Sequence, residues 1–179
     1  MQALHLYKEI KMETVIHPWK PIIDDKSKVL ILGSIPSPKS RENGFYYGHP
    51  QNIFWSTIEQ VVGDNIPENN PKAKTEFLLK NHIAIWDVLY SCEISGASDQ
   101  SIINPVPNKF KPLLEKSNIT AIFTTGKKAT ELFNKLCSFE AGMQAIYLPS
   151  TSPANRGLQG KVEFWNLWNK VRDVLKGTE

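Results

Sequence analysis

Short apolar runs alternate with amphipathic stretches along most of the chain, a pattern typical of proteins in which strands and helices alternate. The clearest run, Val29 to Leu32, has four consecutive apolar residues and is typical of a strand buried on both faces of a parallel sheet. The pattern predicts strands at 28–32, 82–89, 119–124 and 143–148. Apolar positions at helical spacing predict helices near 53–63, 71–81, 108–117, 126–136 and 164–175. We therefore expect an α/β fold, a three-layer sandwich with a central four-stranded parallel sheet and helices on both faces.

Two stretches fall outside this alternation. Residues 1–13 are expected to form either a short helix or a loose arm. The stretch 91–107 carries Gly, Ser, Asp, Asn and two prolines, and it predicts a long loop, which in a compact domain is often functional. Asn108 is expected to cap the short helix that follows. The length of 179 residues and the absence of internal repeats predict a single domain over 1–179.

Composition excludes several classes of protein. The longest apolar runs have four or five residues, and the first 20 residues lack a signal peptide's apolar core, so we expect a cytoplasmic protein, nucleoid-associated if prokaryotic. Cys92 and Cys137 lie far apart without a CxxC pair or a His at ligand spacing, which predicts buried thiols and neither a metal site nor a disulfide framework. The net charge of +3 permits a polyanionic partner without requiring one.

Candidate chemistry is concentrated in residues 33–52, directly after the first predicted strand. Residues 33–40 are rich in Gly, Pro and Ser, and a parallel strand delivers such a loop to the carboxyl edge of its sheet, where open α/β folds place binding sites. An aromatic and amide run, FYYGHPQN, follows at 45–52. Aromatic rings stack on nucleobases with about 1–3 kcal/mol per base, and amides can hydrogen-bond a base edge. The run suggests a flat heterocyclic ligand, although the same residues could simply pack beneath the loop.

Several motifs extend this hypothesis. They are GSIPS (33–37), SRE (40–42), YYGHPQN (46–52), FW (54–55), IWDVL (85–89) with SC (91–92), TGK (125–127) and LPSTSPAN (148–155). Together they resemble the uracil-DNA glycosylase superfamily, and within it the hypoxanthine-DNA (deoxyinosine) glycosylase branch, often called family six, over roughly residues 15–175. The resemblance implies strand order two-one-three-four. It also implies a monomeric DNA glycosylase of base excision repair, without metal or cofactor, that hydrolyses the N-glycosidic bond of a flipped deaminated base in DNA, hypoxanthine first and uracil second.

The resemblance implies a catalytic role for Asn52. Negative charge builds on the departing base as the N-glycosidic bond breaks, and a protein can orient the water or stabilise that charge. Related branches have a polar Asn or Asp just after the first strand, where this chain has Ile35, which can neither bind water nor act as a base. Asn52 matches the later position that the family-six branch uses. The alternative is that Asn52 only caps the helix beginning at Ile53.

The same resemblance implies two further groups of residues. Phe45 is expected to stack on the extruded base, with Tyr46 or Tyr47 as the alternative wall, and His49 to donate to the base or a phosphate. The loop after the first strand would complete this base pocket with Gly33, Ser34, Ile35 and Pro36. The expected DNA-binding residues are Ser37, Gly126, Lys127, Ser150, Ser152, Pro153, Asn155 and Arg156.

Within the second group, Gly126 and Lys127 open a helix that could bind phosphate, and Asn155 and Arg156 would enter the duplex. Leu148 stands where other branches have a His, which removes an imidazole that contacts the base. Ordinary turn chemistry is the alternative for the serines of both loops.

Asp87 lies at the end of the second predicted strand. It is the one carboxylate that the pattern places at the groove expected along the carboxyl edge of the sheet. Burial could raise its pKa enough for base catalysis, but we favour a framework role in which it hydrogen-bonds backbone.

Two other functions stay open at this point. An N-glycosidase of free nucleosides or nucleotides would not need residues 150–157. A nucleic-acid-binding module without catalysis would be consistent with Ile35 and with the missing His. No motif lysine matches a Schiff-base nucleophile, so a monofunctional enzyme without β-lyase activity is expected.

Overall fold

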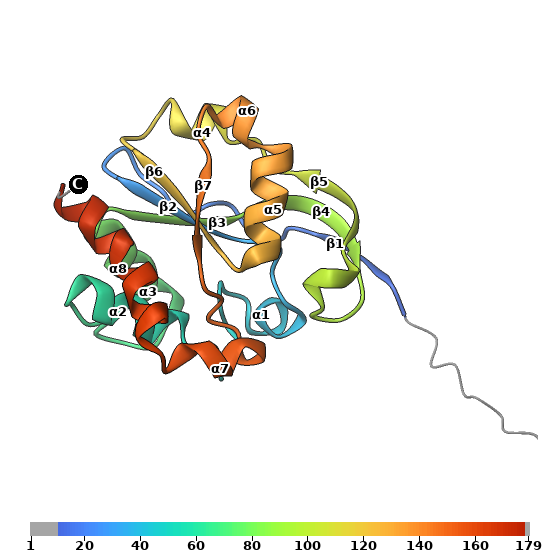
Figure 1. The fold of residues 1–179 in the computed structure, drawn as a ribbon, viewed down its shortest axis with the longest axis horizontal. Coiled ribbons are helices and arrows are strands. Elements are labelled where there is room, and N and C mark those ends of the chain that lie inside the picture. The colour runs from blue at the N-terminus through green and yellow to red at the C-terminus, as the bar shows by residue number, and fades with distance from the viewer. Residues whose placement is uncertain (1–10, 178–179) are drawn as a thin grey trace, which may run out of the picture.

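The computed structural model describes residues 11–177, and a parallel sheet lies at its centre (Figure 1). Its strands are β2 (Val29–Gly33), β3 (Ile83–Asp87), β6 (Ala121–Thr125) and β7 (Ala145–Leu148). They are ordered β3-β2-β6-β7, and each neighbouring pair is parallel. Numbered among themselves, these strands have the order two-one-three-four. The predicted α/β class, sheet and strand order are confirmed.

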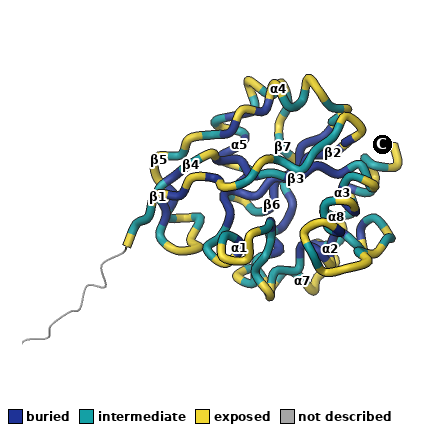
Figure 2. The backbone as a smooth tube through the Cα atoms, turned by 180° about the vertical axis from the view of Figure 1, so that it is seen from behind, coloured by how far each residue is buried: buried dark blue, intermediate teal, exposed yellow. Residues whose placement is uncertain are grey.

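Helices cover both faces of this sheet, as expected. Val29 and Ile31 of β2 pack in one buried cluster, and Leu30 and Leu32 pack in another, because successive side chains of a strand point to opposite faces. The first cluster lies against α2 (Phe54–Val62), α3 (Pro71–Lys80) and α8 (Val162–Lys176). The second lies against α4 (Lys111–Leu114), α5 (Lys127–Leu136) and α6 (Ser138–Ala141). Figure 2 shows the buried stretches at the centre and the exposed ones at the periphery.

A second, antiparallel sheet extends the molecule beside the first, so the prediction of one long loop over 91–107 is wrong. It consists of β1 (Glu13–Ile16), β4 (Leu89–Ile94) and β5 (Ile103–Pro107), in the order β1-β4-β5. Pro105 and Pro107 hid β5 from the pattern, but an edge strand tolerates prolines because one side of its backbone needs no ladder bonds. The turn between β4 and β5 contains the short 3-10 helix η1 (Asp99–Ser101).

Two smaller expectations also need correction. Asn108 does not cap a helix; its Nδ2 donates to the backbone oxygen of Asp87 at 2.9 Å, and α4 begins only at Lys111. The predicted helix or arm at 1–13 lies largely outside the described residues, but its last residue, Glu13, begins β1.

The remaining short elements are α1 (Pro38–Asn43), η2 (Pro153–Asn155) and α7 (Arg156–Gln159). Both cysteines are buried, as predicted, and burial raises the pKa of Cys92 to about 11 and of Cys137 to about 12. Within residues 11–177, every helix is too short or too polar to cross a bilayer.

Candidate active site

A cavity of about 720 Å³ opens at the carboxyl edge of the parallel sheet. Loops that follow β2, β6 and β7 all contribute to its lining, as expected for parallel strands that end at one edge. Most of the residues proposed from the sequence lie here: Gly33, Ser34, Ile35, Pro36, Ser37, Tyr46, His49, Asn52, Gly126, Lys127, Ser150, Ser152, Pro153 and Asn155. Residues more than 100 positions apart in the chain therefore share one hollow.

Phe45 and Arg156 are the two proposed residues that the structure does not place in the cavity lining. The ring of Phe45 is half-buried and stacks on Trp55, with ring centroids 5.7 Å apart and an interplanar angle of 18°. The cavity instead receives the next two aromatic residues, Tyr46 and Tyr47. Arg156 is exposed at the start of α7, next to the cavity residue Asn155. Phe45, the ring that the sequence placed in the base pocket, therefore lies outside the cavity lining, whereas Tyr46 and Tyr47 lie in it.

Asn52 and His49 both present N–H donors at the cavity. The Oδ1 atom of Asn52 accepts from the backbone N–H of Phe54, the first residue of α2, at 3.0 Å. Asn52 thus satisfies a free N–H at the start of the helix, although Ile53 is the N-cap residue. Its Nδ2 has no partner among the described residues and remains available. The Nδ1 atom of His49 accepts from the backbone N–H of Gln51 at 3.0 Å, so the neutral ring carries its proton on Nε2. The cap therefore fixes the orientation of Asn52 and leaves its donor free.

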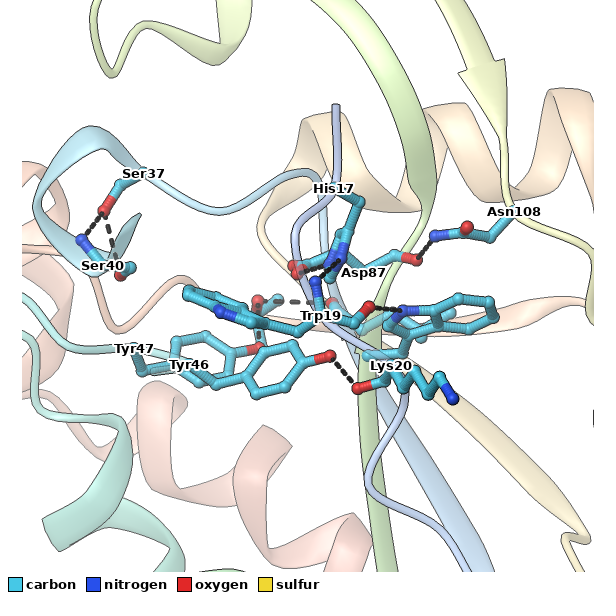
Figure 3. Close-up of polar contacts among 12 residues, drawn as sticks. His17, Trp19, Lys20, Ser37, Ser40, Tyr46, Tyr47, Asp87 and Asn108 are labelled. Atoms are coloured by element: carbon cyan, nitrogen blue, oxygen red, sulfur yellow. Dashed lines mark hydrogen bonds and ion pairs between the residues drawn. The ribbon is translucent and has the colours of Figure 1, made fainter. Parts of the chain in front are cut away.

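Asp87 lies at the floor of the cavity, and its carboxylate is oriented by His17 (Figure 3). The backbone N–H of Trp19 donates to His17 Nδ1 at 3.2 Å, so the proton of the neutral ring is on Nε2, which donates to Asp87 Oδ2 at 2.7 Å. Asp87 is 5% exposed and His17 8%. The carboxylate thus hydrogen-bonds a side chain, whereas the framework role favoured from the sequence required backbone partners.

The second oxygen of Asp87 lies over Gly33, its cross-strand partner on β2. A Cβ placed on Gly33 would come within 2.4 Å of Asp87 Oδ1, so only glycine leaves room for this carboxylate. Gly33 also lines the cavity, and Oδ1 has no partner within residues 11–177. One carboxylate oxygen is therefore held by His17, and the other is presented to the cavity as an acceptor.

Aromatic rings surround the floor of the cavity. Tyr47 stacks on Phe54 at 3.7 Å between ring centroids, and its φ of +50° is unusual for a residue with a side chain. Tyr46 donates its hydroxyl to the backbone oxygen of Lys20 at 2.8 Å and lies 4.9 Å from the ring of Trp19 (Figure 3). Burial raises the pKa of both tyrosines, and the charge of Asp87 raises each further. The phenols therefore stay neutral.

Asp99 is a second carboxylate in the cavity lining, delivered by η1 from the antiparallel sheet. Ser34 Oγ donates to Asp99 Oδ2 at 2.9 Å. Burial raises the pKa of Asp99, the Ser34 hydrogen bond lowers it, and the charges of Asp87 and Lys128 raise and lower it respectively, with a net upward shift. Asp99 thus joins the antiparallel sheet to the loop after β2.

The loop after β7 is held by its own hydrogen bonds. Ser150 Oγ accepts from the backbone N–H of Ser152 at 3.2 Å, and Asn155 Nδ2 donates to the backbone oxygen of Ser150 at 2.9 Å. The backbone N–H of Ile53 donates to Thr151 O at 3.1 Å, which ties this loop to the start of α2 beside Asn52. The turn chemistry weighed for these serines is therefore present, and the loop is a preformed rim of the cavity.

The serine and glycine positions on the other two loops are similarly ordered. Ser37 Oγ accepts from the backbone N–H of Ser40 at 3.2 Å and so caps α1. Gly126 has a φ of +98° and precedes the exposed Lys127 at the start of α5. Its ideal Cβ would lie 3.5 Å from Ser150, so the two loops approach closely here.

Several residues at or beside the cavity were absent from the proposed set. Among them are His17, which contacts Asp87, and the lining residues Trp19, Asp99 and Thr125. His17 is 70 positions from its partner Asp87, and Asp99 is 65 positions from Ser34. A single sequence carries no signal for such pairs, apart from the hydroxyl- and carboxylate-rich segment SGASD at 95–99.

The protein is thus a four-stranded α/β sandwich with a cavity at the carboxyl edge of its sheet, and aromatic rings and amide and imidazole donors line that cavity. The family model of the "Uracil DNA glycosylase superfamily" matches residues 21–172. The chain belongs to this superfamily, and its class is that of the DNA glycosylases.

Individual relatives agree. The chain is 33% identical over 147 residues to a hypoxanthine DNA glycosylase of Methanosarcina barkeri, covering 81% of this chain and 92% of that protein. It is 34% identical over 136 residues to a protein of the same name from Methanosarcina acetivorans, covering 75% and 85%. A solution NMR structure from Methanosarcina acetivorans, described as a candidate uracil DNA glycosylase, superposes with a TM-score of 0.75 at 31% identity, over 88% of this chain and 96% of that one.

Proposed function

We propose that the protein excises a deaminated base from DNA, hypoxanthine first and uracil second, by hydrolysing the N-glycosidic bond of an extruded nucleotide. The relatives named hypoxanthine DNA glycosylase support the first substrate. The expected product is an intact strand with an abasic site, because Lys127, the one lysine among the described residues that line the cavity, does not match a Schiff-base nucleophile.

The observation that carries this proposal is the orientation of Asp87. An ionised carboxylate only accepts hydrogen bonds, and its Oδ1 faces the cavity over Gly33 while His17 holds Oδ2. Hypoxanthine and uracil share a ring N–H beside a carbonyl, whereas adenine and cytosine have an unprotonated ring nitrogen at that place. Asp87 Oδ1 would accept from the N–H of the deaminated bases and repel the lone pair of the normal ones. One acceptor at the floor thus explains a preference for deaminated bases as a class.

The donors of Asn52 and His49 supply the second requirement of the reaction. Negative charge moves onto the base as its bond to the sugar breaks, and preorganised donors stabilise such charge without reorganising. Asn52 Nδ2 and His49 Nε2 are fixed as donors because the other polar atom of each side chain accepts from backbone. We assign Asn52 to the leaving base, with Tyr46 and Tyr47 as the rings beside it. If Asn52 acted as a general base, its Oδ1 would have to accept the proton, but this atom already accepts a hydrogen bond from the Phe54 N–H.

The rim of the cavity suits a DNA strand. Lys127 is exposed at the start of α5, and Asn155 and Arg156 lie at the end of the ordered loop after β7. We assign the phosphates to Lys127 and to the loop serines Ser150 and Ser152. Asn155 and Arg156 then lie where the extruded nucleotide leaves the duplex, a step that costs a few kcal/mol.

The direct test is a cleavage assay on labelled oligonucleotides that carry one deoxyinosine or one deoxyuridine, with abasic sites broken by alkali. We expect product from deoxyinosine above that from deoxyuridine, and no strand break before alkali. Asn52→Ala should lower the single-turnover rate at least tenfold, about 1.4 kcal/mol of transition-state stabilisation. The absence of product from both substrates, with the DNA still tightly bound, would instead identify a binding module.

Asn52→Asp separates catalysis from helix capping. An aspartate at this position can still accept from the Phe54 N–H and so keeps the cap, but it has no N–H to donate. We expect Asn52→Asp to unfold at the wild-type temperature and to be as slow as Asn52→Ala. An Asn52→Asp protein with wild-type rate would show that Asn52 serves only as a cap.

A further inference from the structure

Hydrolysis requires a group that holds the attacking water and accepts its proton, and the residues assigned above do not supply one. Ile35 is apolar, and the oxygen of Asn52 accepts from Phe54. Asp87 lies deep at the floor, where its free oxygen is assigned to the base. Among the described residues that line the cavity, Asp99 is the remaining carboxylate.

The position of Asp99 suits a water better than it suits the base. Asp99 is partly buried, whereas Asp87 is only 5% exposed, so we place Asp99 nearer the mouth of the cavity, where the sugar of an extruded nucleotide would enter. Ser34, which directly precedes Ile35 in the chain, donates its Oγ–H to Asp99 Oδ2 at 2.9 Å. Its Oδ1 has no protein partner in the part of the chain that the structure describes. A carboxylate oxygen is thus available next to the segment of the loop that contains the apolar Ile35.

The turn that carries Asp99 is ordered by its own hydrogen bonds. Ser101 Oγ accepts from the backbone N–H of Ser95 at 2.8 Å and donates to Ser98 O at 2.7 Å. The backbone N–H of Ser98 donates to Ser95 O at 3.1 Å. The strand that precedes this turn, β4, is tied to the loop after β2 because the Leu89 N–H donates to Ser34 O at 3.0 Å. Asp99 is therefore held against Ser34 by both side chain and backbone.

We propose that Asp99 is the general base of the reaction, orienting the attacking water and accepting its proton; this inference rests on the proposed glycosylase activity. In the step, the bond from C1′ to the base breaks and its electron pair leaves with the base. The water oxygen forms the new bond to C1′, and one of its protons passes to the Asp99 carboxylate. The base takes a proton from solvent, and Asp99 later returns its own to solvent.

The surroundings of Asp99 favour this role. Burial raises the pKa of Asp99 and so strengthens it as a base; the Asp87 charge acts in the same direction, while the Ser34 hydrogen bond and Lys128 on α5 oppose it. Burial raises the pKa of the Cys92 thiol on β4, and the charge of Asp99 raises it further, so the thiol stays neutral. The acid limb of the pH–rate profile should therefore have an apparent pKa above the ordinary range for an aspartate.

Asp99→Asn tests the proposal with little structural change, because the amide oxygen can still accept from Ser34. We expect its single-turnover rate on a deoxyinosine duplex to fall by about a hundredfold or more, with DNA affinity within threefold of wild type, and the acid limb of its pH profile to disappear. Glu93→Gln is the matched control. It makes the same chemical change on the same hairpin, where Glu93 Oε1 accepts from Asn104 outside the cavity, and it should keep wild-type rate and pH profile.

Chemical rescue distinguishes a base from a structural anchor. Sodium formate should raise the single-turnover rate of Asp99→Ala at least tenfold, because a small carboxylate can occupy the vacated space. The rates of wild type and Asn52→Ala should not change. An Asp99→Asn protein with wild-type rate, or an Asp99→Ala protein that formate does not accelerate, overturns the inference while the wild-type activity stands. A wild-type protein without glycosylase activity on either base overturns both this inference and the proposed function.

Discussion

The parallel sheet brings Asp87 to the cavity at the end of a strand whose residues are almost all buried, whereas the antiparallel sheet brings Asp99 in a turn between two strands. Asp87 has a backbone fixed on both sides, since β3 pairs with β2 and Asn108 holds its carbonyl at 2.9 Å. Asp99 depends on one hydrogen bond to Ser34 and on the internal bonds of its turn. The same cavity therefore contains one rigidly positioned carboxylate and one whose position is set locally.

This difference indicates how each group should respond to change. The floor depends on close packing between strands, so a single added atom there should displace the carboxylate. The Asp99 turn lies at the surface and can tolerate an isosteric substitution.

Gly33→Ala should have the largest effect on activity. The new Cβ would lie 2.4 Å from Asp87 Oδ1, so the carboxylate must leave its position over the cavity. We expect a loss of about a thousandfold in the rate on deoxyinosine, from the misplaced acceptor and the narrowed floor. Gly160→Ala is the control, because its added Cβ meets nothing within 4 Å and its φ is −90°. A Gly33→Ala protein with wild-type rate would show that the position of Asp87 does not matter.

His17→Ala should reduce both stability and activity, to a smaller extent. It removes the donor at 2.7 Å from Asp87 Oδ2 and leaves a buried carboxylate unpaired. The free energy of unfolding, measured by urea denaturation, should fall by about 1.5–3 kcal/mol, the range for a hydrogen bond to a charged group. The cleavage rate should fall about tenfold as Asp87 loses its fixed orientation. His17→Gln, whose amide nitrogen can donate to the same oxygen, should recover part of the stability; equal losses in both variants would contradict the pairing.

Asp99→Asn should have the smallest effect on stability. Unlike His17→Ala, it should raise the free energy of unfolding. The pKa of Asp99 is raised in the folded protein, chiefly by burial, so its ionised form is disfavoured there. The resulting loss of stability is absent below the pKa of aspartate in the unfolded chain, about 3.9, and is complete above the pKa of Asp99 in the folded protein. Thermal unfolding should therefore show Asp99→Asn slightly more stable than wild type at pH 7, with the difference vanishing toward pH 4. A lower unfolding temperature at pH 7 would show that the carboxylate stabilises the fold.

The two sheets also differ in how far the sequence predicted them. The run Val29–Leu32 identified β2 because four buried residues in a row have few other interpretations, and the motif at 46–52 placed Asn52 and His49 correctly in the cavity. The antiparallel sheet escaped prediction because Pro105 and Pro107 and a register shift in β4 disrupt its alternation. With it, His17 and Asp99 were missed as site residues.

Local backbone geometry explains the remaining difference. Phe45 and Tyr47 are two positions apart, and the sequence favoured Phe45 as the stacking ring. The positive φ of Tyr47 turns the chain so that Tyr47 covers Phe54 and lines the cavity, while Phe45 packs on Trp55. A φ in this region for a tyrosine is rare, and no sequence pattern announces it.

Asp87→Asn tests whether Asp87 distinguishes deaminated bases by accepting a hydrogen bond from their ring N–H. Because His17 Nε2–H must donate to the amide oxygen, the Nδ2 of the new asparagine would face the cavity and offer a donor where an acceptor stood. The measurement is the ratio of single-turnover rates on duplexes with deoxyinosine or deoxyadenosine at one site. We predict a fall of about a hundredfold in the deoxyinosine rate and a clearly smaller ratio. An unchanged rate and ratio in folded Asp87→Asn protein would contradict the account.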